Sequence, residues 1–357
     1  MIISKLILTI FFLVCSTTAK IVFKRPITKA MREHLGRVIG GTDAAATEYP
    51  FMAFLMIDDG DLTAFCGGTI IARQWILTAG HCVVNTGAGN KLTNATRHAP
   101  WHPMRSFTSV KPGKITVGLG STYNAETQHY KVSKVHVHPD LNLDYFDNDI
   151  ALLKLKKKIS YNNAVQPIHI DTGVVTDGMT VTGVGWGKTS LESQTTAQVL
   201  QQVDLTTGNE ALCKQIRSQF DSNDGNYICV TTPEGRDTCS GDSGGPLLRR
   251  CNNNPDSTGS TGSGPWVQLG ITSYGDSAER DMDTVCASSN GAGFYTHVAP
   301  YLDFISKTTG IKKKNFAATC NGGKIDYIGN DNAGAKVSPA FAAFIIAILA
   351  EVLFSLY

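Results

Sequence analysis

Three short motifs bring a hydroxyl, an imidazole and a carboxylate into one chain: CSGDSGGP around Ser243, TAGHC around His81 and DNDIALL around Asp149. A serine hydroxyl is a weak nucleophile at neutral pH, and it needs a positioned base such as an imidazole. A carboxylate on the other imidazole nitrogen would select the tautomer and stabilise the imidazolium. The three motifs therefore indicate nucleophilic acyl-transfer chemistry.

The order His, Asp, Ser and the residues around each motif resemble the trypsin/chymotrypsin family of serine endopeptidases, over residues 37–309. Asp144 and Asp147 compete with Asp149 for the carboxylate role. We prefer Asp149 because it directly precedes IALL, the strand that follows the catalytic aspartate in the family. The resemblance implies an all-β fold of two six-stranded antiparallel barrels with the cleft between them. It also implies peptide-bond hydrolysis through an acyl-enzyme, without a cofactor.

The resemblance also implies the groups that support the reaction. The backbone N–H groups of Gly241 and Ser243 would form the oxyanion hole, and Gly241 suits it because glycine permits unusual backbone angles. Ser273 matches the family serine that supports Asp149. Ser273, Tyr274 and Gly275 would pair with the substrate backbone as an added strand. Tyr274 stands where the family often has tryptophan.

The primary specificity pocket is implied in the same way. Asp237 lies six residues before Ser243, where trypsin-like members hold an aspartate that pairs with Arg or Lys of the substrate. Gly275 and Gly293 match the pocket walls, and Thr238 is a small polar neighbour. We therefore expect protein or peptide substrates cut after Arg or Lys.

The sequence RVIGG around Val38 resembles the activation site of the family. Cleavage after Arg37 by an activating protease would free the Val38 amine to pair with Asp242. An unpaired buried charge is costly, so the new pair would order the oxyanion site. Residues 20–37 are then a basic propeptide, and the precursor should be nearly inactive.

Composition agrees with a turn-rich β protein, because the chain has 35 glycines and only 8% aromatic residues. The net charge of +2 indicates neither nucleic acid nor an anionic membrane as a partner. We expect no metal, because the stretch 121–130 that matches a family calcium loop offers only Glu126. We interpret His136 and His138 as structural.

The first 19 residues, led by Lys5 and strongly apolar, predict a signal peptide cleaved after Ala19. Removing it leaves eight of the nine cysteines, in an oxidising compartment. The resemblance implies the disulfides Cys66–Cys82, Cys213–Cys229 and Cys239–Cys286. Cys251 and Cys320 are left to pair with each other, to stay free or to bridge two chains. Asn94 carries the one glycosylation sequon.

The end of the chain predicts a helix over 301–307, a polar stalk over 311–338 and an apolar tail over 339–357. Small residues at 332–334, a spacer and the tail resemble a signal for a GPI anchor, with Asn330 as an alternative attachment point. A transmembrane tail, disfavoured by Glu351, and a soluble product remain open. We therefore expect a secreted protease domain, residues 38–310, attached to the cell surface.

Three segments are longer than in a minimal trypsin: 85–113, the Gly/Ser-rich 252–264 and the acidic 276–285. Extended loops around a cleft restrict which proteins enter it, so we expect a selective protease, regulated by protein inhibitors. Two other classes stay open: a catalytically silent surface module, and a hydrolase of esters or other acyl donors.

Overall fold

The computed structural model describes residues 40–58, 63–85, 107–190, 193, 195–231, 236–251, 259–260, 262–277, 286, 291–321 and 323–327. All of them belong to one compact unit, Gly36–Tyr357. The predicted signal peptide, propeptide and apolar tail, the sequon at Asn94 and most of the acidic loop lie outside the described residues.

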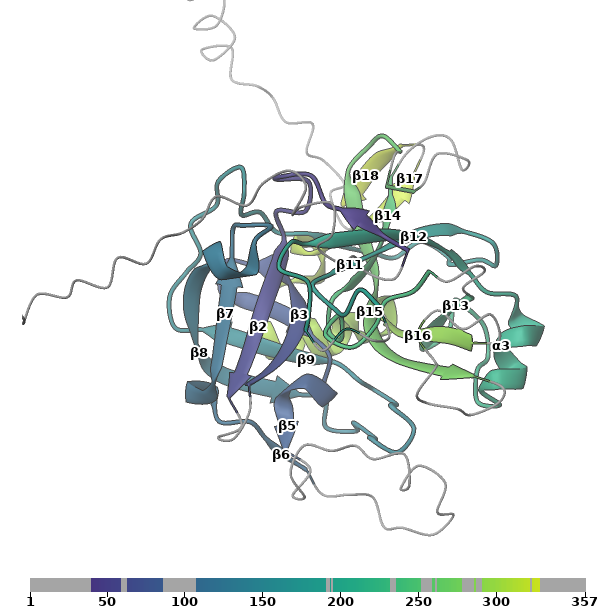
Figure 1. The fold of residues 1–357 in the computed structure, drawn as a ribbon, viewed down its shortest axis with the longest axis horizontal. Helices are drawn as coiled ribbons and strands as arrows, with labels where there is room; N and C mark the ends of the chain where they lie inside the picture. The colour runs from purple at the N-terminus through teal and green to yellow at the C-terminus, as the bar shows by residue number, and fades with distance from the viewer. Residues whose placement is uncertain are drawn as a thin grey trace, which may run out of the picture. The chain divides into compact units, whose positions relative to one another are not determined.

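Six strands close the first barrel, shown in purple and blue in Figure 1. In spatial order they are β2 (Met52–Asp58), β3 (Thr63–Ala72), β4 (Trp75–Thr78), β9 (Ala151–Leu155), β8 (Gln128–Val137) and β7 (Ile115–Leu119). Apolar side chains such as Leu55, Ile76 and Val117 are fully buried. Closure pairs every strand with two neighbours, so the barrel leaves no exposed strand edge. The short strands β5 (Val84–Asn85) and β6 (Thr108–Ser109) pair beside it.

The second barrel follows in the chain and uses six more strands. They are β14 (Pro246–Arg250), β11 (Thr180–Gly185), β12 (Gln201–Thr207), β13 (Tyr227–Thr231), β16 (Gly291–His297) and β15 (Trp266–Ser277). Antiparallel pairing of β14 with both β11 and β15 closes the ring, and β1 (Thr42–Asp43) pairs with β12. The predicted fold of two six-stranded antiparallel barrels is confirmed.

Short helices complete the unit. Helix α3 (Glu210–Ile216) begins at Asn209, whose side chain accepts a hydrogen bond from the backbone N–H of Ala211. Helix α4 (Leu302–Thr309) ends at Gly310, whose φ of 72° suits a glycine cap. The prediction of a helix over 301–307 is therefore confirmed with shifted ends. Single 3-10 turns cover η1 (His81–Val83), η3 (Pro112–Lys114), η4 (Asn124–Glu126), η7 (Ala299–Tyr301) and η8 (Lys313–Asn315).

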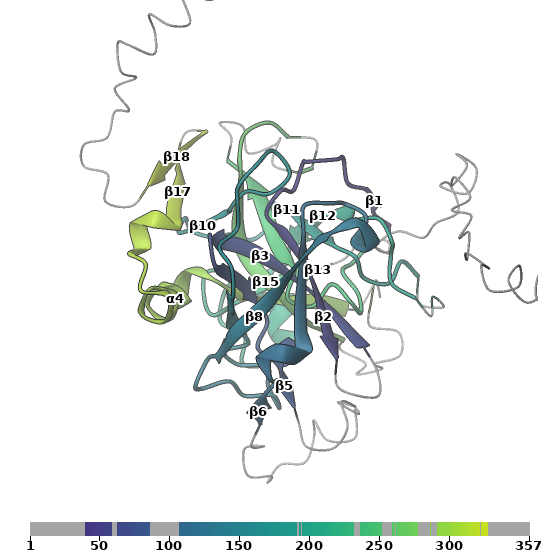
Figure 2. The same ribbon diagram turned by 90° about the vertical axis from the view of Figure 1, so that its left-hand side faces the viewer.

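A hairpin follows α4, and Figure 2 shows both in yellow-green at the left of the view. Its strands are β17 (Ala317–Asn321) and β18 (Lys324–Tyr327), and β17 pairs in parallel with β10 (His169–Asp171). The first part of the segment that we interpreted as a polar stalk is therefore folded onto the domain. Its composition looked like a stalk because a short edge hairpin buries few apolar side chains.

Four disulfides fasten the two barrels and the hairpin. Besides the three pairs implied by the family resemblance, Cys251 is bonded to Cys320 on β17. Of the alternatives for these two cysteines, the structure has the intrachain pair. Such disulfide use fits an extracellular compartment. Across the described ranges we find no helix with the length and apolar character needed to cross a membrane.

Candidate active site

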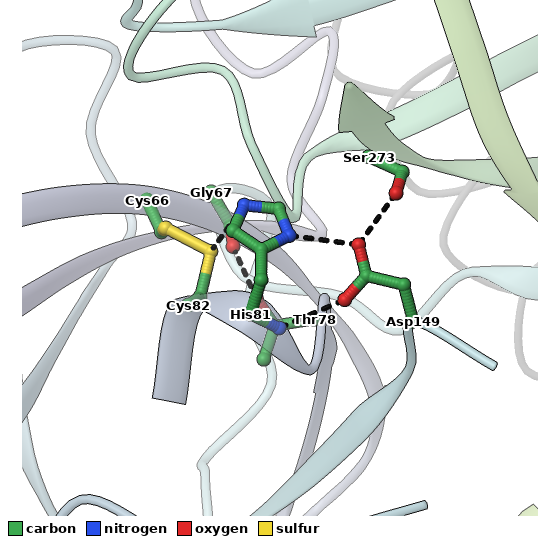
Figure 3. The surroundings of a disulfide bond; sticks show 7 residues. All are labelled: Cys66, Gly67, Thr78, His81, Cys82, Asp149 and Ser273. Atoms are coloured by element: carbon green, nitrogen blue, oxygen red, sulfur yellow. Dashed lines mark hydrogen bonds and ion pairs between the residues drawn. A yellow bond between two sulfur atoms is a disulfide. The ribbon is translucent and has the colours of Figure 1, made fainter. Parts of the chain in front are cut away.

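Figure 3 shows His81 and Asp149 side by side, next to the disulfide Cys66–Cys82. His81 Nδ1 lies 2.7 Å from Asp149 Oδ2, and the backbone N–H of His81 donates to Oδ1 at 2.8 Å. The Ser273 hydroxyl donates to Oδ2 at 2.5 Å. Asp149 is completely buried. Burial alone would raise the pKa of Asp149, but the contacts with His81 and Ser273 hold it below its ordinary value.

The local sequence explains this placement. His81 opens η1 directly after β4, and the disulfide Cys66–Cys82 ties that turn to β3. Gly80 precedes it, where an added Cβ would lie 3.3 Å from Asp149 Oδ1. The Thr296 hydroxyl donates to the backbone carbonyl of Asp149 at 3.0 Å. The second barrel thus helps to hold a residue of the first.

Asp147, the competitor for the carboxylate role, faces a different partner. Arg217 Nη2 donates to Asp147 Oδ1 at 2.8 Å, and the Tyr227 hydroxyl donates to the same oxygen. Of Asp147 and Asp149, it is Asp149 that contacts the imidazole of His81, as preferred on sequence grounds.

Ser243 sits in a tight turn between the barrels. Its carbonyl accepts a hydrogen bond from the N–H of Gly67 at 2.7 Å. Gly241 has a φ of 101°, and an added Cβ there would lie 2.9 Å from Thr196 Cγ2. Both the backbone angle and the space therefore require glycine two residues before Ser243. This is the turn whose N–H groups were predicted to form the oxyanion hole.

One pocket of about 250 Å³ joins the residues from both barrels. It is lined by His81, Phe146, Asp237, Thr238, Cys239, Ser240, Ser243, Thr272, Ser273, Tyr274, Gly275, Cys286 and Gly293. The pocket brings together His81, Ser243 and all six of the residues predicted to bind substrate. Such convergence of polar groups in one concave site is typical of an active site.

Asp237 lies in the wall of this pocket and is only 2% exposed. An added Cβ on Gly293 would lie 3.3 Å from its Oδ1, so the glycine leaves the carboxylate room for a ligand. Thr238 instead hydrogen-bonds the Tyr295 hydroxyl at 2.8 Å. Burial and the negative charge of Asp237 raise the pKa of Tyr295 well above its ordinary value.

Asp242 is also completely buried, behind Ser243. Its carboxylate accepts hydrogen bonds from the N–H groups of Gly187 at 2.7 Å and Cys239 at 2.9 Å. Burial raises its pKa to about 6, although these two hydrogen bonds oppose the rise. Its predicted partner Val38 and the cleavage point Arg37 lie outside the described residues.

Sequence reasoning missed two residues of the site. Phe146 packs edge-on to His81 and stacks on Tyr274 at 4.9 Å between ring centroids. Arg217, 6% exposed, donates from Nη1 to the Tyr274 hydroxyl and to the Tyr145 carbonyl. Phe146 lies just before the motif that begins at Asp147, so no motif indicated it. Arg217 directly follows α3, and no sequence pattern there indicated a role in the site.

One group of potential metal ligands lies within the described part of the chain: Cys66, His81 and Cys82. The two sulfurs form a disulfide, so they offer no thiolate to a metal.

The comparisons with known proteins agree with this geometry. The trypsin family model matches residues 38–305. Trypsin-1 of Astacus astacus is 33% identical over 75% of this chain and 98% of its own length. CLIP domain-containing serine protease B4 of Anopheles gambiae is 30% identical over 75% of this chain and 69% of its own. Mannan-binding lectin serine protease 1 of Rattus norvegicus is 26% identical over 80% of this chain and 37% of its own length.

The family model thus matches most of the chain. The structure agrees with that match, because it has two barrels, a contact between buried Asp149 and His81, and a pocket that His81 shares with Ser243. The chain belongs to the trypsin family of serine proteases.

Proposed function

We propose that this protease is an endopeptidase that cleaves after Arg or Lys. Asp237 carries the proposal, because it is a nearly buried carboxylate in the pocket that also contains His81 and Ser243. A buried carboxylate binds a guanidinium or an ammonium through charge-assisted hydrogen bonds. Gly275 and Gly293 have no side chains in the pocket wall, which leaves the depth that a long basic side chain needs.

The reaction begins at Ser243. His81 Nε2 takes the hydroxyl proton as Ser243 attacks the carbonyl carbon of the scissile peptide bond. Asp149 stabilises the imidazolium through its 2.7 Å contact with Nδ1. The N–H groups of Gly241 and Ser243 bind the oxyanion, and His81 returns the proton to the leaving amine. Water then hydrolyses the acyl-enzyme by the same steps.

The substrate backbone lies along the end of β15. Ser273, Tyr274 and Gly275 belong to this strand, and all three line the pocket. Hydrogen bonding to the backbone places the scissile bond without reading its side chains. The resulting preference for extended peptides separates an endopeptidase from a hydrolase of small esters.

The chain is made as a zymogen and is activated by a protease that cuts after Arg37. The buried Asp242 supports this step, because a carboxylate with a pKa of about 6 is stabilised strongly by a nearby ammonium. The freed Val38 amine supplies that ammonium. Gly185 and Gly187 leave space beside the carboxylate, since an added Cβ on either would lie within 2.2 Å of its oxygens.

The protease works outside the cell and is attached to its surface through the apolar tail at 339–357, as a GPI-anchored protein. Protein inhibitors that fill the cleft regulate it.

Peptide hydrolysis tests the specificity. The chain is cut after Arg37 and offered peptides with Arg, Lys, Phe or Ala before the scissile bond. We expect cleavage after Arg and Lys, none with Ser243→Ala, and a loss of about 100-fold or more in kcat/KM with Asp237→Ser. That loss reflects about 3–5 kcal/mol for breaking a buried charge pair. Efficient cleavage after Phe or Ala by the unmodified enzyme would refute the assignment of Asp237.

A further inference from the structure

Six lysines gather on the outer surface of the first barrel, on β8, on β9 and directly after β9. We call them the basic face: Lys131, Lys134, Lys154, Lys156, Lys157 and Lys158. Five of them are exposed, and Lys154 is half-buried. In Figure 1, β8 is labelled at the left and β9 nearer the centre of the view. The net charge of only +2 for the whole chain conceals this local concentration.

Strand register brings two of these charges face to face. Lys134 on β8 pairs directly with Lys154 on β9, because the ladder shifts register between Val132 and Lys134. Like charges directly opposite one another destabilise a sheet. Lys154 gains a cation–π contact with the ring of Trp75, at 5.5 Å, whereas Lys134 has no such contact with any ring in the described part of the chain. Folding therefore does not explain why both positions are lysine.

Carboxylates do not neutralise the basic face. Within the described segments, none of its six lysines forms an ion pair. The acidic residues between the two strands come after Val137, at the other end of β8: Asp140, Asp144, Asp147 and Asp149. Arg73 is a further cation beside the basic face. Its carbonyl accepts a hydrogen bond from the backbone N–H of Ile159, the residue after Lys158.

The neighbouring His136 reports the same positive field. Burial lowers its pKa, and the charges of Lys134 and Lys154 lower it further. A surface with this field attracts a ligand that carries several negative charges close together.

Three classes of ligand have that property: nucleic acids, anionic membranes and sulfated polysaccharides. The disulfides place the folded chain in an oxidising, extracellular setting. The anionic leaflet of a cell membrane faces the cytoplasm. Membrane docking also favours apolar side chains that enter the lipid. Of the described residues, the exposed large apolar ones are Phe65, Tyr145, Val174, Leu212 and Tyr327, and none belongs to β8 or β9.

We propose that the basic face binds a sulfated polysaccharide of the extracellular matrix or cell surface. The face is a binding surface separate from the cleft. Lys154 is the fourth residue of β9, which begins two residues after Asp149, so the backbone positions of Asp149 and Lys154 are separated by up to about 16 Å at roughly 3.3 Å per residue. A polysaccharide chain on the face therefore leaves the pocket open, and it concentrates the protease where its substrates are.

Binding of the full chain to heparin, a sulfated polysaccharide, tests the proposal. The test variant carries Lys134→Gln, Lys156→Gln and Lys157→Gln. The control variant carries Lys214→Gln, Lys307→Gln and Lys324→Gln, which remove the same net charge from other surfaces. Dissociation constants are measured between roughly 50 and 200 mM salt, where counterion release makes affinity strongly salt-dependent. Thermal unfolding of each variant establishes that it is folded.

We expect the unmodified chain and the control to bind heparin alike, and the test variant to bind at least about 10-fold more weakly. The slope of log Kd against the logarithm of the salt concentration should be smaller by about two to three in the test variant, close to one for each lysine contact removed. Three results overturn the proposal: equal weakening in the control, equal binding to an unsulfated polysaccharide, or binding to phosphatidylserine vesicles but not to heparin.

Discussion

Arg217 joins the two sides of the cleft, and replacing it with methionine tests how much that junction contributes. The residue follows α3 of the second barrel, and its guanidinium reaches the loop of the first barrel that leads to Asp149. Nη1 donates to the Tyr145 carbonyl at 2.8 Å and Nη2 donates to Asp147 at 2.8 Å. The guanidinium also lies 4.1 Å from the ring centroid of Tyr227. Methionine keeps much of the aliphatic volume and removes these three contacts, together with the hydrogen bond to the Tyr274 hydroxyl.

The expected loss of stability follows from the burial of each contact. A hydrogen bond from a charged donor contributes about 1.5–3 kcal/mol. The pair with Asp147 contributes less than a buried pair, because Asp147 is 41% exposed and water can replace the guanidinium. A desolvated cation–π contact adds about 2 kcal/mol. These contributions overlap, so we expect a total of about 2–4 kcal/mol.

Urea unfolding measures this loss. Lys214→Met on α3 is the matched control, because its ion pair with Glu210 is exposed to solvent and stabilises the fold little. Arg217→Met should also raise KM for extended peptides more than it lowers kcat, since Tyr274 loses the donor on its hydroxyl. Unfolding of Arg217→Met within about 0.5 kcal/mol of the unmodified chain would show that the junction is not a stabilising contact.

Three further predictions concern the turn at Gly241, the buried carboxylate of Asp242 and the basic face. Gly241→Ala should lower kcat by about 100-fold or more with little change in KM, because its φ of 101° and the nearby Thr196 exclude a side chain; normal kcat would contradict this. Asp242 has a folded pKa of about 6 against an ordinary 3.8, so in the uncleaved chain its stabilising contribution is complete below about pH 3.8 and is lost as the pH rises through 6. Between pH 4 and 7 the unmodified precursor should therefore lose up to about 3 kcal/mol relative to Asp242→Asn, and parallel melting curves would count against this. Lys134→Thr should stabilise the fold by a few tenths of a kcal/mol and so raise the melting temperature slightly, because it removes the repulsion opposite Lys154; a lower melting temperature would mean that Lys134 stabilises the sheet.

The sequence was sufficient for the barrels and for the residues around Ser243. Motif residues such as His81 and Asp149 lie in short local patterns, and their neighbours specify the turns that hold them. Asp237 was expected to lie in one pocket with Ser243 because the two residues are close in the chain.

The rest depends on contacts between distant segments, which no local pattern encodes. Arg217 is separated from Asp147 by 70 residues, and only the approach of the two barrels makes them partners. Lys134 faces Lys154 because of one register shift, which the alternation of β8 does not reveal. The hairpin of β17 and β18 escaped prediction because its docking depends on β10 and on Cys251, not on its own composition.

The Cys251–Cys320 bond also determines how a pulling force would travel through this protein. Tension applied to the chain beyond Tyr327 enters β18 and reaches Cys320, and the disulfide then carries it directly to Cys251 on the second barrel. The two cysteines are 69 positions apart, and the segment between them contains Ser273, β16 and α4. That segment stays relaxed while the disulfide is intact. If the protease is tethered through its C-terminus, as proposed, Ser273 and β15 would therefore stay unstrained when the tether is stretched.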